Sequence, residues 1–97
     1  MFSEKQVLLE NEYGKLEGEL FLGQLFLHLT LYKWSVNLYK VYREFFDNYL
    51  PVLRRMGFTK VYVAIPKDNK KLIKFERMFG FEPEHDLAEV LIMSRST

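Results

Sequence analysis

The stretch from Gly57 to Phe81, GFTKVYVAIPKDNKKLIKFERMFGF, decides the fold of this chain. The apolar run from Val61 to Ile65, mostly β-branched and aromatic, predicts a strand over 60–65. Pro66 ends this strand because proline has no amide to donate to a sheet. The residues after it predict a short basic helix over 69–79, which Gly80 can end in a left-handed conformation. Such a unit is too small to fold alone, so the preceding residues must supply the rest of a sheet.

The other elements follow from hydrophobic periodicity on either side of this stretch. Alternation and tight turns predict strands over 5–11, 15–22, 25–34 and 87–94, and apolar residues at helical spacing predict a longer helix over 37–56, kinked or restarted at Pro51. The longer helix joins two parallel strands in a crossover, and the strands linked by tight turns are expected to be antiparallel. The sequence therefore predicts one α+β domain over 1–97, with a mixed, mostly antiparallel sheet of about five strands and two helices.

Composition excludes several classes of function. The chain has 97 residues, a net charge of +1 and no cysteine, so it can hold neither a disulfide scaffold nor a thiolate site. Two histidines far apart in such a sequence predict no metal site. No apolar run is long enough to cross a membrane, and early glutamates argue against a signal peptide, so we expect a cytoplasmic protein, free or within an assembly such as a virion.

The order of elements, with Asn69, Phe75 and the pair Gly80-Phe81 at family spacing, resembles the C-terminal two-thirds of GCN5-related N-acetyltransferases (GNAT). The resemblance covers about residues 5–94. It implies a chain that begins at the family's second strand and lacks the first strand and first two helices, which usually form the acceptor pocket. The sequence also resembles, less specifically, the small, degenerate acetyltransferase-like proteins that phages often carry.

The same resemblance implies where a cofactor and a catalytic acid would lie. Family members often carry a tyrosine four residues before the glycine, which protonates the departing coenzyme A thiolate; here that residue is Glu76. The family's glycine-rich turn, whose backbone amides bind the coenzyme A diphosphate, is here the bulky segment 34–40, WSVNLYK. A cap at Ser35 or Asn37 would use one of those amides. We therefore expect acetyl-coenzyme A binding to be lost or much weakened.

If the chain were active, two groups could move protons and five residues could contact the cofactor. Glu76 could act as an acid only if deep burial raised its pKa; the simpler interpretation is a boundary residue that reaches water. His28 could be a general base, although a hydrogen-bonded sheet histidine is the default. The residues expected to hold acetyl-coenzyme A are Trp34, Ser35, Asn37, Asn69 and Phe75.

The strand over 25–34 has leucines at positions 25, 27, 29 and 31, and aromatic and polar residues at its even positions. The leucine face is expected to pack against a helix, and two helices cannot easily cover both faces of the sheet. The aromatic and polar face of the sheet is therefore expected to be an interface for a protein partner or a second copy, unless the second helix or the N-terminal segment covers it. The interface residues predicted are Phe21, Phe26, Tyr32 and Trp34.

The short helix carries a basic face of Lys70, Lys71, Lys74 and Arg77. A solvated surface is the simpler interpretation, and binding of an acidic partner or a phosphate is the alternative. Nucleic-acid binding is disfavoured by the near-zero net charge and the lack of interleaved stacking aromatics. The leading hypothesis is thus a non-catalytic, acetyltransferase-like protein without cofactor, acting as a homodimer or in a larger assembly. The competing hypothesis is an acetyl-coenzyme A-dependent N-acetyltransferase acting on a protein or small amine.

Overall fold

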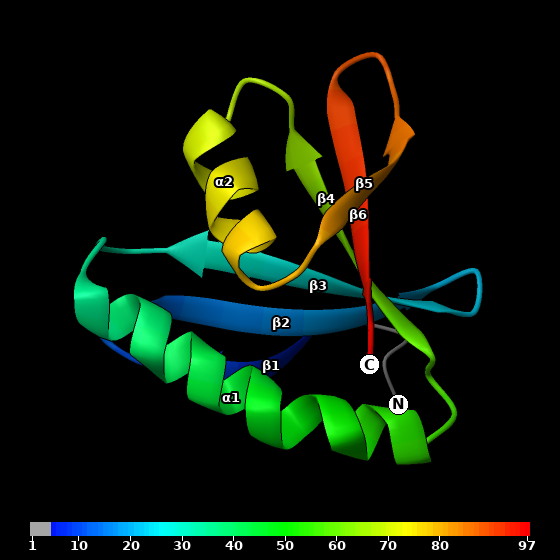
Figure 1. The fold of residues 1–97 in the computed structure, drawn as a ribbon, viewed down its shortest axis with the longest axis horizontal. Helices are drawn as coiled ribbons and strands as arrows, with labels where there is room; N and C mark the ends of the chain where they lie inside the picture. The colour runs from blue at the N-terminus through cyan, green and yellow to red at the C-terminus, as the bar shows by residue number, and fades with distance from the viewer. Residues whose placement is uncertain (1–4) are drawn as a thin grey trace.

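Six strands form one mixed sheet with two helices in the computed structural model, which describes residues 5–97 (Figure 1). Across the sheet the strands follow the order β1-β2-β3-β4-β6-β5. Only β3 and β4 are parallel, and α1 connects them; all other neighbours are antiparallel. The predicted α+β class is confirmed. The elements are β1 (Gln6–Glu10), β2 (Gly14–Phe21), β3 (Gln24–Leu31), α1 (Val36–Arg55), β4 (Lys60–Pro66), α2 (Lys70–Met78), β5 (Glu82–Asp86) and β6 (Val90–Ser96).

The expectation of about five strands was one too few. The additional strand, β5, lies between the predicted short helix and the predicted last strand, and β6 begins at Val90 rather than at residue 87. All five residues of β5 are exposed, and this strand pairs with β6 alone at the edge of the sheet. An exposed edge strand needs no buried face, so its sequence lacks the apolar alternation that revealed the others.

Both helices begin at side-chain caps. The Ser35 hydroxyl accepts a hydrogen bond from the Leu38 amide, and the Asn69 side chain accepts one from the Leu72 amide, each at 3.2 Å. These contacts satisfy amides that have no partner inside the helix. Of the two caps considered for the longer helix, Ser35 and Asn37, the structure thus uses Ser35. The longer helix runs through Pro51 without a break.

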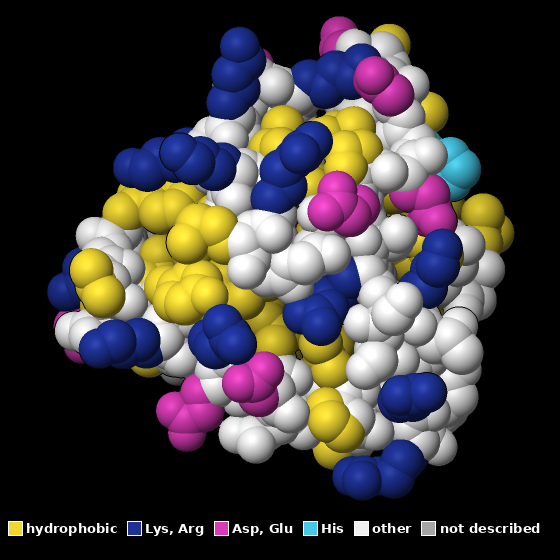
Figure 2. Space-filling view, in the orientation of Figure 1, with side chains coloured by type: hydrophobic (Ala, Val, Ile, Leu, Met, Phe, Trp, Pro, Cys, Tyr) yellow, Lys and Arg dark blue, Asp and Glu magenta, His cyan; other side chains and the backbone are white. Residues whose placement is uncertain are grey.

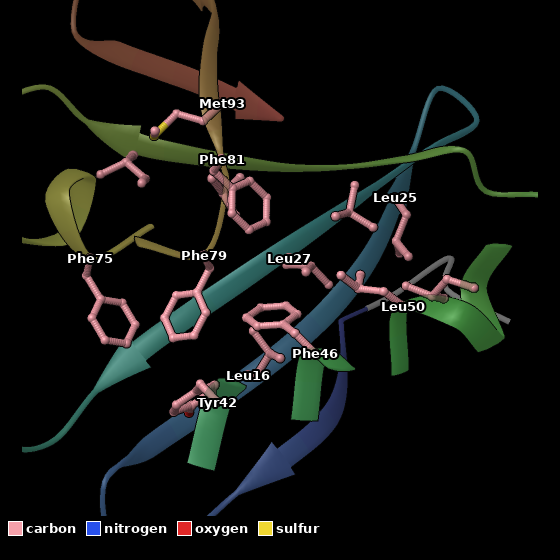
Figure 3. Close-up of a cluster of buried hydrophobic side chains, with 14 of the residues drawn as sticks. Leu16, Leu25, Leu27, Tyr42, Phe46, Leu50, Phe75, Phe79, Phe81 and Met93 are labelled. Atoms are coloured by element: carbon pink, nitrogen blue, oxygen red, sulfur yellow. The ribbon is translucent and has the colours of Figure 1, made fainter. Parts of the chain in front are cut away.

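Both helices pack on the leucine face of the sheet. Leu16, Leu25 and Leu27 of the sheet are buried beneath aromatic rings from α1 and α2 (Figure 3). The ring of Phe46 in α1 lies 5.3 Å from that of Phe79, directly after α2, and the ring of Tyr42 lies 6.4 Å from that of Phe75. No helix of residues 5–97 therefore covers the opposite face, which carries Phe26.

The parallel strands β3 and β4 touch over a short distance and then diverge. Their register contains a single pair, Phe26 with Tyr62, and beyond it the two strands separate toward their carboxyl ends (Figure 1). The start of α2 follows β4 at this end of the sheet. Residues of both strands line a groove at this divergence.

Candidate functional site

A groove lies where β3 and β4 diverge, and we call it the strand groove. Its cavity volume is about 320 Å³, and it is lined by parts of β3, β4 and α2. Three of the residues that the sequence selected for chemistry line it together: His28, Asn69 and Glu76. The groove is thus lined by both proposed proton-transfer groups, His28 from the open face of the sheet and Glu76 from α2 on the other face.

Glu76 is buried, which corrects its interpretation as a boundary residue that reaches water. Only 2% of the residue is exposed, and its Oε2 atom has no hydrogen-bond partner within residues 5–97. Burial raises the pKa of this carboxyl from 4.5 to about 8, because an ionised group loses its hydration there. The carboxyl is therefore mostly protonated at neutral pH, which is the state that a proton donor needs.

The physical reason for this burial is the position of Glu76 on α2. It follows Leu72 by four residues, on the helix face that turns toward the sheet, next to buried Phe75. The hydroxyl of Tyr42, from α1, is a second buried polar group without a hydrogen-bond partner in the described chain. Burial raises the pKa of Tyr42 to about 12, with smaller contributions from Tyr32 and Glu76.

His28 has a hydrogen-bond partner on the open face of the sheet. Its Nε2 atom lies 2.9 Å from Oε1 of Glu19, on the neighbouring strand β2, and both side chains are half-buried. This arrangement fits the interpretation as a hydrogen-bonded sheet histidine. Because one ring nitrogen already bonds Glu19, a role as general base would require the other nitrogen or the loss of this bond.

A second groove lies between the start of α1 and α2, and we call it the helix groove. Its volume is about 650 Å³, and it is lined by Trp34, Ser35, Val36, Tyr39, Lys71, Lys74, Phe75 and Met78. The cofactor residues predicted from the sequence are thus divided between two places. Asn69 lines the strand groove, while Trp34, Ser35 and Phe75 line the helix groove. Asn37 is exposed and lines neither.

The turn that leads into α1 is crowded. The indole of Trp34 meets the ring of Phe75 edge-on at 5.3 Å, and the Lys71 ammonium lies 4.4 Å from the centre of the Trp34 ring. The Ser35 hydroxyl accepts a hydrogen bond from the Leu38 amide. A diphosphate that binds at a helix start needs several free backbone amides with few bulky side chains around them. Here the Leu38 amide is already bonded to Ser35, and the indole of Trp34 lies beside the turn.

Trp34 does not belong to the aromatic face of the sheet, which corrects the predicted interface. The strand β3 ends at Leu31, so the alternation that placed Trp34 beside Phe26 no longer applies three residues later. Trp34 instead packs against α2. Tyr32 is exposed, and its hydroxyl donates to Glu10 at 3.1 Å.

Phe21, Phe26 and Tyr62 form the aromatic cluster of the open face. The rings of Phe21 and Phe26 lie 6.2 Å apart, and those of Phe26 and Tyr62 stack at 5.4 Å. Tyr62 was not among the interface residues predicted from the sequence. Its position between Val61 and Val63, which are buried on the helix side, places it on the open face of the sheet. We call these three residues the aromatic cluster.

Residues 5–97 contain neither a metal-binding cluster nor a helix that could span a membrane. No group of three or more His, Asp or Glu side chains is placed to hold a metal ion. Neither of the described helices is long and apolar enough to cross a membrane.

Comparison with known proteins shows the fold alone. No protein-family model and no curated protein matches the chain. A domain from Methanocaldococcus jannaschii, known from its crystal structure, resembles it with a TM-score of 0.63 at 18% sequence identity. The similarity covers 94% of this chain and 63% of that domain, so this chain spans less than two-thirds of its structural neighbour.

Proposed function

We propose that this chain is an acetyltransferase-like domain that does not use coenzyme A and acts in the cytoplasm as a binding component of a dimer or larger assembly. The observation that carries the proposal is the crowded start of α1, where Ser35 caps the helix and Trp34 packs onto Phe75. In the family that the sequence resembles, this turn binds the diphosphate. With one of these amides already bonded to Ser35 and the Trp34 side chain beside the turn, the acidic half of coenzyme A is held less well here than in that family.

The surface for self-association is the open face of the sheet, centred on the aromatic cluster. Phe21 is 59% exposed at the edge of that cluster, and neither helix covers it. Exposed aromatic rings in one patch are typical of protein interfaces, where their burial supplies much of the binding energy. The same face also carries Glu19 beside His28, polar groups suited to the rim of such an interface.

Titration of the protein with acetyl-coenzyme A by isothermal calorimetry is expected to give no saturable binding in the micromolar range. The reason is the loss of diphosphate contacts, which leaves the thioester arm to bind alone. The control is the same titration monitored by amide chemical shifts of residues 34–40, which are expected to stay unchanged. Micromolar binding with shifts in this segment would refute the proposal.

Sedimentation is expected to show that the wild-type protein associates and that Phe21→Glu shifts it toward the monomer. A carboxylate in the aromatic cluster would be buried without a partner in the associated form. Trp34→Glu is the matched control, because Trp34 lies on the other side of the sheet. A wild-type monomer at all concentrations, or equal effects of both substitutions, would exclude the aromatic cluster as the interface.

A second function, N-acetyl transfer, is favoured by one specific observation. Glu76 is a buried, protonated carboxyl in the strand groove, at the position where the family has its catalytic tyrosine. In this alternative, Glu76 would protonate the departing thiolate and His28 would take a proton from the amine. The same calorimetric titration decides between the two functions, because this one requires acetyl-coenzyme A to bind.

A further inference from the structure

The helix groove has apolar and basic lining residues, and the proposed function assigns no ligand to it. We propose that it binds an acidic amphipathic helix of a partner protein, with apolar side chains in the groove and carboxylates against Lys71 and Lys74. This surface is separate from the aromatic cluster, and the proposal does not depend on self-association through the open sheet face.

Exposed apolar side chains gather at this groove. Val36 is 73% exposed, Met78 54% and Trp34 41%, and all three line it. Figure 2 shows hydrophobic side chains together between the start of α1 and α2, bordered by Lys and Arg side chains. Single exposed apolar residues are ordinary, but several around one concave surface normally mark a binding site.

The positive charges at the groove have no carboxylate partner among the described residues. Lys71 and Lys74 line it and form no ion pair within residues 5–97, and the same holds for three other cations of the two helices, Lys40, Lys70 and Arg77. Neither helix has an acidic residue in its first turn. By contrast, Lys15, Lys33, Lys60 and Lys67 each pair with a carboxylate. The unpaired charges favour a partner that supplies carboxylates.

The shape and the aromatic contacts favour a peptide helix over a nucleic acid. A groove between two helices accepts the apolar stripe of a third, which presents anchors at helical spacing. Lys71 covers a face of the Trp34 ring at 4.4 Å, and the ring of Phe75 meets the indole nearly at right angles. Base stacking on Trp34 would have to displace Lys71, the same cation that would contact the phosphates.

Trp34 is the single tryptophan of the chain, so its fluorescence reports on the groove directly. The probe is a synthetic peptide of about four helical turns, with leucines at helical spacing on one face and glutamates on the other. Binding is expected to shift Trp34 emission to shorter wavelength and to reduce its quenching by acrylamide. A scrambled peptide of the same composition is expected to do neither.

Charge reversal supplies the decisive variants. The double substitution Lys71→Glu and Lys74→Glu is expected to weaken binding of the acidic peptide at least tenfold. This variant is expected to bind instead a peptide in which lysines replace the glutamates. Reversing Arg54 and Arg55, at the other end of α1, is the matched control and should leave the affinity unchanged. Val36→Asp is expected to weaken binding while preserving the fold, because an acid suits the first turn of a helix.

Several outcomes would overturn the proposal. These are no change in Trp34 emission, equal binding of the scrambled peptide, or an equal loss in the Arg54 and Arg55 variant. Displacement of the peptide by coenzyme A or by dodecanoate at similar concentration would assign the groove to a small amphiphilic anion instead. Displacement by a single-stranded oligonucleotide would assign it to nucleic acid.

Discussion

Phe46→Ala is expected to lower the free energy of unfolding by about 3–5 kcal/mol, because it removes a ring on which both helices depend. Phe46 is 4% exposed, and its ring contacts those of Phe79 and Phe81 at 5.3 and 6.2 Å. These rings connect α1 to the end of α2 and to the residues that lead into β5. The measurement is denaturant unfolding of wild type and variant, followed by circular dichroism.

Phe21→Ala is the matched control, since it removes the same ring from a position that is mostly in water. It is expected to cost less than about 1 kcal/mol when measured at a concentration where the protein is monomeric. Similar losses for the two variants would mean that the open face is packed as tightly as the helix face. That result would also remove the reason for proposing an interface at the aromatic cluster.

The fold could be predicted from the sequence wherever burial leaves a periodic pattern. The strands β2, β3 and β4 alternate because only one of their faces is buried, and α1 repeats at helical spacing for the same reason. The edge strand β5 has no buried residue, so its five residues gave no pattern. Its place is fixed by pairing with β6, a long-range contact that local periodicity does not report.

The candidate site could be predicted only in part, because its decisive features are tertiary. The position of Glu76 was found from the sequence, but its burial depends on how α2 lies against the sheet where β3 and β4 diverge. Trp34 lies outside the sheet face because β3 ends at Leu31, three residues before it. The sequence did not predict this end correctly, because the ends of strands carry only weak sequence signals. Tyr62 joined the aromatic cluster because the parallel register sets it beside Phe26.

Glu76→Gln is expected to remove a decline in stability that the wild-type protein shows as pH rises. At pH values below 4.5 the carboxyl is protonated in both the folded and the unfolded chain, and it does not affect their balance. Between 4.5 and about 8 the unfolded chain releases this proton while the folded chain retains it, which favours unfolding by about 1.4 kcal/mol per pH unit. Above about pH 8 the loss is complete, and it amounts to several kcal/mol.

The measurement is the difference in unfolding free energy between Glu76→Gln and wild type, taken at intervals from pH 4 to pH 9. Glu44→Gln is the matched control, because it removes a carboxyl of the same kind from an exposed position on α1. A constant difference across this range would mean that the Glu76 carboxyl titrates as it does in water. In that case Glu76 could not hold a proton at neutral pH, and this result would exclude the alternative function in which Glu76 protonates a departing thiolate.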